Sequence, residues 1–392
     1  MNRNEIRPDP ERLTSKADEI CRRAVSEPSC FGIIFRLLQH GKLVAESSAG
    51  VEDPDTGKPV TADTMFRLAS MTKPVTAAAV LAACDRGLLS LYDPVSKYLP
   101  GFGKLWLGKK VIRPDGGFDF VPDRLCEQTL RIHHLITHTN GIGAGEAGYE
   151  VQWRIPRKYR QSLAAVSDYI PENFPLDFEP GTMLSYSTTL GGDIAGRVIE
   201  VASGMEFGEF IRVNLLSPIG ADDITFEPSD EQRTRFMRMI DRDAAGNAFA
   251  DDSLGLSTFE NLPLSYHSGG ASLAGSMNSY TRFAEMLRSD GILDGVRVLS
   301  TASARLLHTP WIAPGTPGLG EIETWGLMVR IVNSGHPYLP EGVYGWSGAY
   351  GTYFWVDPVN DMSGIIMRNS RFDGCQDSQT ALCFEKAVYE AQ

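Results

Sequence analysis

The chain has 392 residues, of which 42% are hydrophobic and 22% charged, as in an ordinary soluble globular protein with two domains or one large domain carrying an insertion. Its formal net charge is −12 and no run of basic residues occurs, which argues against nucleic acid or an anionic membrane as a partner. The first 19 residues are polar and the longest apolar run is too short to cross a bilayer, so we expect neither a secretory signal nor a membrane span.

The first predicted elements are a helix and two strands. Residues 9–27 have the pattern of an amphipathic helix. Residues 31–39 and 43–50 have strand composition, and His40-Gly41 between them indicates a hairpin turn.

The next element combines an alcohol with an amine. Ser70 precedes Lys73 by three residues, a spacing that places both side chains on one face of a helix. Pro74 is tolerated only in a first helical turn, so the helix begins close to Ser70. Residues 75–84 are apolar on every side, which predicts a buried helix that ends near Gly87. Burial disfavours an ammonium, so the pKa of Lys73 should fall toward values useful for a general base.

Serine three residues before lysine is a weak signal alone, because most such pairs only begin a solvated helix. No other lysine of this chain has serine at that spacing, and this pair adjoins a buried helix. These two features favour a catalytic interpretation.

The middle of the chain, residues 88–258, has helical patterns separated by long loops rich in proline and glycine, with few strand-like runs. We predict helices at residues 129–138, 192–203 and 206–214. A further helix, 276–289, is opened by a capping serine.

The C-terminal third is rich in strands. They are predicted at residues 324–332, 343–348, 351–356 and 362–367, with a hairpin loop at 357–361 and a closing helix at 376–391. Strands at both ends predict an α+β fold, in which one antiparallel sheet is assembled from both termini and flanked by the terminal helices. We expect residues 1–87 and 259–392 to form this discontinuous sheet domain, and residues 88–258 to form an inserted, mostly helical domain.

Two further segments contain candidate site residues. Tyr186 follows a Pro-Gly turn and precedes an apolar helix; it is either a packing residue or a phenol close to an ammonium that lowers its pKa and makes it a proton carrier. Residues 346–351 (WSGAYG) are a glycine-flanked strand segment. The glycines alone favour a bulge or a tight turn, and the alternative is an edge strand that offers a free amide to a substrate carbonyl.

Four motifs together resemble a known family. The chain carries, in order, FRLASMTK at 66–73, LITHTNG at 135–141, YST at 186–188 and WSG at 346–348. It resembles serine hydrolases with the class C β-lactamase and penicillin-binding-protein fold, above all family VIII carboxylesterases and lovastatin-type acyltransferases. The resemblance implies that Ser70 is the nucleophile of an acyl-enzyme. It also implies that Lys73 and Tyr186 share the general-base work, and that the amides of Ser70 and Ala349 form the oxyanion hole.

Two departures from the β-lactamases bear on the substrate. Thr188 stands where they carry asparagine, and Trp346 stands where they carry a lysine that would pair with a penicillin carboxylate. We therefore rank cleavage of uncharged, hydrophobic carboxylic esters above cleavage of β-lactams. Acyl transfer, or hydrolysis of an amide, uses the same acyl-enzyme and stays open. A catalytically silent binding protein would lack one of the three chemical groups, which are the hydroxyl of Ser70, the amine of Lys73 and the phenol of Tyr186.

Other residues were weighed as site residues. We predict structural roles for His133, His134 and His138 because no third zinc ligand is evident, and for the His267 segment because it resembles a glycine turn. Besides Trp346, Ser347 and Gly348, two loop aromatics, Trp153 and Tyr149, are candidate substrate-binding residues, and Trp106 is a weaker one.

The six cysteines are scattered without metal-ligand spacing, which predicts free thiols and a cytoplasmic protein. We expect a small-molecule ester as the substrate, with no metal and no cofactor. The oligomeric state is left open.

Overall fold

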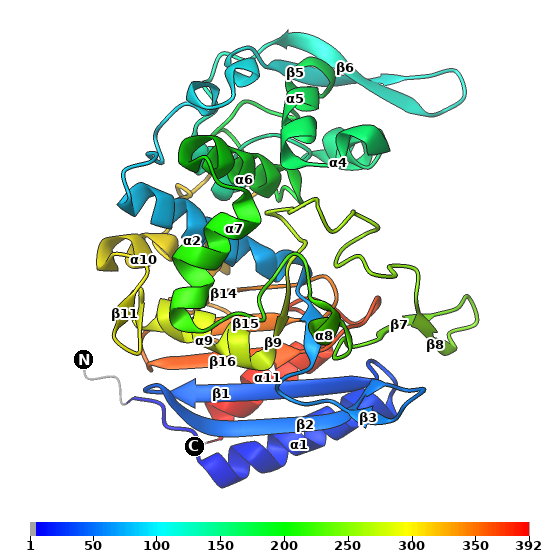
Figure 1. Cartoon of the computed structure of the whole chain (residues 1–392), viewed down its shortest axis with the longest axis vertical. Coiled ribbons are helices and arrows are strands. Elements are labelled where there is room, and N and C mark those ends of the chain that lie inside the picture. The colour runs from blue at the N-terminus through cyan, green and yellow to red at the C-terminus, as the bar shows by residue number, and fades with distance from the viewer. Residues whose placement is uncertain (1–4, 392) are drawn as a thin grey trace.

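An eight-stranded antiparallel sheet is assembled from both ends of the chain in the computed structural model, which describes residues 5–391 (Figure 1). The strands follow one another across the sheet in the order β12-β13-β14-β15-β16-β1-β2-β3. In that order they span Glu323–Trp325, Arg330–Val332, Tyr344–Ser347, Tyr353–Asp357, Met362–Met367, Gly32–Gln39, Lys42–Asp53 and Lys58–Pro59. The two halves meet where β1 pairs with β16, with Ile34 opposite Met367. The prediction of one sheet built from both termini is confirmed.

Helices cover both faces of this sheet (Figure 1). On one face lie α1 (Pro10–Ser26) and α11 (Gln379–Glu390), where Phe384 stacks on Phe35 at a centroid distance of 4.4 Å. On the other lies α9 (Met277–Arg288), where Tyr280 meets the ring of Phe354 at 5.2 Å. Because successive side chains of a strand point to opposite faces, the sheet contributes to two separate apolar layers, one on each face.

Helix α2 (Thr72–Asp85) is buried along almost its whole length. Every residue from Thr72 to Ala83 is buried, as its all-round apolar sequence predicts. It packs against α6 (Leu190–Ser203) and α10 (Thr301–Leu307), and the chain leaves it through Gly87 at a φ of 69°. The helix thus forms a rigid base for the residues at its N-terminus.

The region between the two halves of the sheet holds the remaining helices. They are α3 (Ile132–Ile136), α4 (Glu146–Gln152), α5 (Leu163–Asn173), α7 (Phe207–Ile211) and α8 (Asp230–Arg233). This region also contains two hairpins, β5–β6 and β7–β8, which span Trp106–Ile112 with Phe118–Leu125, and Met239–Arg242 with Ala248–Asp251. The sequence predicted neither of these two hairpins. The boundaries at 87/88 and 258/259 stay a prediction.

The predicted strand at residues 324–332 is two short strands, β12 and β13. A tight turn separates them, closed by a 2.9 Å bond from the amide of Gly326 to the carbonyl of Val329. Met328 holds a φ of 56° in this turn, a conformation that sequence patterns assign to glycine or asparagine. The turn was missed because methionine gives no turn signal.

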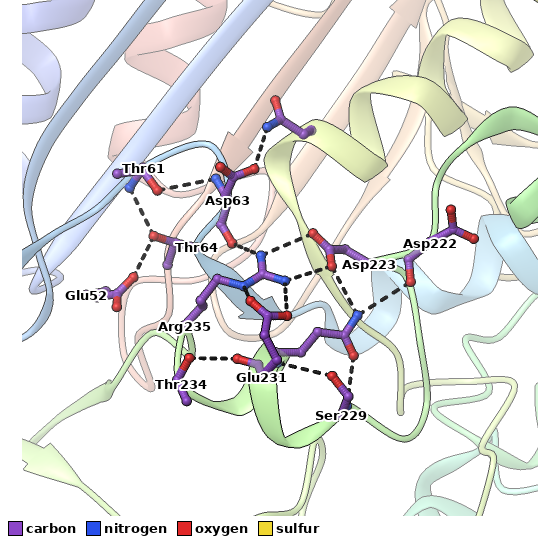
Figure 2. Close-up of polar contacts among 12 residues, drawn as sticks. Glu52, Thr61, Asp63, Thr64, Asp222, Asp223, Ser229, Glu231, Thr234 and Arg235 are labelled. Atoms are coloured by element: carbon purple, nitrogen blue, oxygen red, sulfur yellow. Dashed lines mark hydrogen bonds and ion pairs between the residues drawn. The ribbon is translucent and has the colours of Figure 1, made fainter.

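Strand β4 (Met65–Arg67), which leads into Ser70, pairs with β9 (Ala274–Ser276) and is fixed by a polar network around Arg235 (Figure 2). The Arg235 guanidinium donates to the carbonyl of Asp63 at 2.5 Å and to Asp223 at 3.0 Å, and it pairs with Glu231 at 2.9 Å. The backbone carbonyl of Arg235 accepts a hydrogen bond from the amide of Met65 at 2.8 Å. The partly buried side chain of Arg235 therefore connects residues 222–235 to the strand that precedes Ser70.

All six cysteines are free thiols, and Cys21 and Cys30 among them are buried. Among residues 5–391, no helix combines the length and the apolar character that crossing a membrane requires.

Candidate active site

Ser70 lies in a single 3₁₀ turn, Ala69–Met71, between β4 and α2. Ala69 directly before it holds a φ of 44°, a left-handed conformation that turns the chain sharply from strand to helix. Two bonds fix the turn: Tyr280 donates to the carbonyl of Met71 at 3.0 Å, and Thr72 Oγ1 accepts the amide of Leu273 at 3.0 Å. Ser70 keeps 8% of its surface exposed, so its hydroxyl is held at the edge of the core.

Lys73 lies one turn further along and is completely buried. Its Nζ is 3.3 Å from Ser70 Oγ, 2.5 Å from the carbonyl oxygen of Thr188 and 2.9 Å from that of Gly270. An ammonium has three donors and no lone pair, whereas a neutral amine has two donors and one lone pair. Two carbonyl oxygens and the Ser70 hydroxyl oxygen satisfy the three donors of an ammonium. In the neutral amine the two N–H groups keep the carbonyls and the lone pair is free to face Ser70 Oγ.

Electrostatics determine how much of the neutral amine is present. Burial lowers the pKa of Lys73 to about 7, and the nearby carboxylate of Asp193 opposes this shift. A large share of the Lys73 side chains is therefore neutral near pH 7, whereas almost none of an exposed lysine's would be.

Tyr186, in the segment before α6, completes a triad of side chains. The Lys73 nitrogen lies 4.6 Å from the centroid of its ring, and the phenol makes hydrogen-bonding contacts with Ser70 and Trp346. Burial nevertheless raises the pKa of Tyr186 well above its ordinary value, although both contacts lower it. The expectation that a nearby ammonium lowers this pKa was wrong, because loss of hydration on burial dominates. Tyr186 is therefore a protonated phenol at neutral pH.

The glycine-flanked segment forms a turn between β14 and β15. Strand β14 pairs with β13 and β15, so the edge-strand alternative was wrong. Ala349 lies in a tight turn beyond the end of β14, which was the other alternative. The Gly348 backbone runs so close to the carbonyl of Leu68 that a Cβ would lie 2.2 Å from that oxygen. Ala349 is exposed, and neither its amide nor that of Ser70 donates a hydrogen bond to another residue of the 5–391 range. Two free amides on adjoining segments are what an oxyanion hole requires.

An aromatic group surrounds the phenol. The indole N–H of Trp346 donates to Tyr186 Oη at 3.2 Å, and the ring of Trp325 meets Trp346 at a centroid distance of 4.6 Å. The buried ring of His138 lies 4.7 Å from Tyr186 and 4.8 Å from Trp325. Its Nδ1 accepts the amide of Ser187 at 3.3 Å, and burial lowers the pKa of His138 far below its usual value. His138 is thus a neutral packing partner of the tyrosine.

The other predicted substrate-binding residues lie in different places. Ser347 is buried, and its hydroxyl contacts the side chain of Gln376. Trp153, which ends α4, is 37% exposed and lines a cavity of about 590 Å³ between residues 153–161 and 257–263. Tyr149 on α4 is exposed and is not among the residues lining that cavity. The structure therefore brings Trp153, but not Tyr149, to a cavity wall.

None of Ser70, Lys73 and Tyr186 lines that cavity, but two hydrogen bonds connect its wall to the segments that present the two free amides. Arg67, three residues before the nucleophile, donates to the carbonyl of Ser257 at 3.1 Å. Tyr350, next to Ala349, donates to Glu260 at 3.0 Å. Ser257 and Glu260 both line the cavity, so one loop connects its wall to both segments.

The histidines set aside have structural partners. His133 and His134 lie ring against ring at 4.0 Å, and burial lowers their pKa values to about 4 and about 3. His267 is 2.7 Å from Glu227 and stacks on Phe226 at 4.9 Å. No cluster of three potential metal ligands occurs among residues 5–391.

Sequence reasoning missed two residues of this site, Trp325 and Asp193. Trp325 reaches Tyr186 only because β12 lies at the edge of the sheet, and no local signal distinguishes it from a packing tryptophan. Asp193 is a buried carboxylate in the apolar helix α6, and a charge in such a helix was the available signal.

Comparison with known proteins extends these observations. Residues 17–382 match the family model described as Beta-lactamase. The chain is 28% identical to Esterase EstB of Burkholderia gladioli over 406 aligned positions, which cover 96% of this chain and 95% of that protein. Among solved structures it is similar to EstCE1, a hydrolase with promiscuous acyltransferase activity, with a TM-score of 0.78, 22% identity and coverage of 97% and 99% of the two chains. It is also similar to a mutant of simvastatin synthase (LovD) from Aspergillus terreus, with a TM-score of 0.77, 21% identity and coverage of 98% and 94%.

Proposed function

Because the chain belongs to the Beta-lactamase family of serine hydrolases and acyltransferases, we propose that it is a carboxylesterase whose nucleophile is Ser70. The observation that carries the proposal is the buried Lys73 side chain, whose nitrogen is held by two carbonyls and lies 3.3 Å from Ser70 Oγ. A serine without an activated base is a poor nucleophile at neutral pH, and this amine supplies the base.

Acylation then proceeds by transfer of one proton. Lys73 takes the hydroxyl proton while Ser70 Oγ attacks the ester carbonyl, and the new C–O bond forms as the carbonyl oxygen gains negative charge. The amides of Ser70 and Ala349 donate to that oxygen, each contributing on the order of 3 kcal/mol to the transition state.

Tyr186 supplies the proton that the leaving alcohol needs. Its phenol stays protonated and contacts Ser70, so it protonates the departing alkoxide and recovers its proton from the Lys73 ammonium. The same groups act in reverse in deacylation, when water replaces the alcohol and the acid is released. Lys73 is thus the base of acylation and Tyr186 the acid.

The substrate we propose is an uncharged ester of modest size. Trp346 supplies an apolar surface at the position where β-lactamases have a lysine, and the 590 Å³ cavity beside Trp153 has the size of a small-molecule site. Esterase EstB, a relative over nearly the whole chain, supports ester cleavage.

The test of this proposal is hydrolysis of a nitrophenyl ester by the Ser70→Ala variant. We expect kcat/KM to fall by more than about 1,000-fold with the fold retained. A variant with full activity would overturn the assignment of Ser70.

Acyl transfer is the second candidate function. It shares every step up to the acyl-enzyme, and EstCE1 is described as a hydrolase with promiscuous acyltransferase activity. Product analysis with alcohol and amine acceptors present during ester turnover decides between the two: transferred acyl groups support a transferase, and free acid alone supports an esterase.

A further inference from the structure

A buried carboxylate near Lys73 has no part in the steps above. Asp193 lies on α6 with 1% of its surface exposed. A carboxylate so deeply buried is costly unless its oxygens accept hydrogen bonds. Ser268 Oγ donates to Asp193 Oδ1 at 2.5 Å, and the Tyr266 hydroxyl donates to Oδ2 at 2.8 Å.

This network fixes the charge of Asp193. Burial raises the pKa of Tyr266 far above its usual value, so Tyr266 keeps its proton and donates it. Ser268 Oγ accepts the amide of Gly270 at 3.3 Å, which leaves its own proton for Asp193. Burial raises the pKa of Asp193, and the bonds from Ser268 and Tyr266 and the nearby Arg160 cation oppose that shift. Because each named partner donates to the carboxyl group, the hydrogen-bond pattern is that of an ionised acceptor.

The turn at residues 268–270 connects Asp193 to the catalytic lysine. The carbonyl of Gly270 accepts from Lys73 Nζ at 2.9 Å, and the carbonyl of Gly269 accepts from Thr76 Oγ1, one turn along α2, at 2.7 Å. On its other side the turn touches α6, where a Cβ on Gly192 would lie 2.6 Å from the carbonyl carbon of Gly269. The turn is therefore clamped between the helix that carries Lys73 and the helix that carries Asp193.

We propose that Asp193 is a positioning residue for Lys73. It holds the 268–270 turn so that the Gly270 carbonyl orients the amine, and its negative charge stabilises the ammonium that forms when Lys73 removes the proton of Ser70. The proposal rests on the proposed function, in which Lys73 is the base. The arrangement has the logic of an acid–base–serine triad, with lysine in place of histidine.

The other groups that face Lys73 are uncharged. Tyr186 is a protonated phenol and His138 a neutral imidazole, because burial raises the pKa of the first and lowers that of the second. Asp193 is the charged group that counters the effect of burial on the pKa of Lys73. Removing its charge should therefore move the titration of Lys73 to lower pH.

The test follows the rate at which a fluorophosphonate modifies Ser70 between pH 5 and pH 9, measured by intact mass. In wild type we expect a rise with an inflection near pH 7, at the pKa of about 7 of Lys73. In Asp193→Asn the inflection should move down by about one pH unit, and the plateau rate should fall about tenfold or more, because the ammonium loses its partner.

Thr76→Val is the matched control, because it removes a hydrogen bond to the same turn without changing any charge. It should lower the plateau rate and leave the inflection at the wild-type pH. An Asp193→Asn inflection at the wild-type pH would overturn the proposal, whatever the rate, because a merely structural carboxylate would give that result.

Ser268→Ala keeps the test decisive if Asp193→Asn does not fold. The Ser268 hydrogen bond stabilises the charge of Asp193, so losing the hydroxyl raises the pKa of Asp193. The inflection of the Ser70 modification rate should therefore move to lower pH, by less than in Asp193→Asn. A wild-type profile in Ser268→Ala would overturn the proposal. A wild-type protein that takes no adduct at Ser70 would instead overturn the proposed function, and the role of Asp193 with it.

Discussion

The indole nitrogen of Trp346 donates a hydrogen bond to the phenol oxygen of Tyr186 across 3.2 Å. The tryptophan stands where the β-lactamases that this chain resembles have a lysine. The donor to the tyrosine oxygen there is therefore an uncharged N–H. The exchange removes a cation that would attract a substrate carboxylate.

The first prediction concerns that bond. Trp346→Phe keeps an aromatic wall but loses the donor, so kcat/KM for alkyl esters should fall about five- to tenfold, the worth of one hydrogen bond of about 1 kcal/mol. Steady-state hydrolysis measures the effect. The control is Trp311→Phe, which loses an indole bond of the same 3.2 Å length, to the carbonyl of Leu306, outside the site. Equal losses in the two variants would contradict the role of Trp346.

The second prediction separates the roles of Tyr186 and Lys73 by leaving group. Nitrophenolate leaves without a proton, whereas an alkoxide needs one. Tyr186→Phe should therefore slow ethyl esters about 100-fold or more and slow nitrophenyl esters of the same acid much less. Rates for the two esters, measured on one enzyme preparation, give the ratio. A variant equally impaired on both would show that the phenol does not serve as the acid.

The third prediction is the pH dependence of hydrolysis. A base works only when deprotonated, so kcat/KM should be low below pH 6, rise through the Lys73 pKa of about 7 and level off above pH 8. Lys73→Arg keeps a cation that does not deprotonate, and its rate should fall about 100- to 10,000-fold at every pH. Substantial activity of that variant would contradict the assignment of the base.

The fourth prediction concerns stability rather than catalysis. Glu385 on α11 is fully buried, accepts the Tyr353 hydroxyl at 2.7 Å, and burial raises its pKa from 4.5 to about 7. The pKa of Glu385 is higher in the folded state than in the unfolded state. The protonated Glu385 therefore contributes fully to stability below pH 4.5, and this contribution is lost as the pH rises through 7.

Glu385→Gln keeps the acceptor for Tyr353 but carries no charge. It should match wild type in free energy of unfolding at pH 4.5 and exceed it by up to about 3 kcal/mol at pH 8. Urea unfolding at the two pH values measures this difference. Glu390→Gln, on the exposed face of the same helix, should leave stability unchanged at both. Equal stability of Glu385→Gln and wild type at pH 8 would contradict the pKa shift.

The sequence predicted the parts of this molecule that depend on local geometry. The three-residue spacing of Ser70 and Lys73 determines their proximity on any helix, and Pro74 restricts where that helix begins. The alternating C-terminal strands and the apolar α2 follow from periodicity in the same way. These elements also carry the family motifs, so the fold and the family were predicted together.

The remainder depends on contacts between distant segments. Nothing near Asp193 indicates that the 268–270 turn will reach it, and nothing near Trp325 indicates that β12 will bring it to Tyr186. The hairpin of β5 and β6 was missed because its strands are mostly exposed and lack apolar alternation, although residues 114–117 (PDGG) are a turn signal. The pKa of Tyr186 was predicted in the wrong direction because its burial is a tertiary property.

The most direct test of the central claim is the mass of the enzyme after reaction with a nitrophenyl carbamate, whose carbamoyl-enzyme hydrolyses slowly. The account predicts one added carbamoyl group per chain, located by peptide mapping to the segment that contains Ser70, and no adduct in Ser70→Ala. An adduct on another residue, or one that persists in Ser70→Ala, would contradict it.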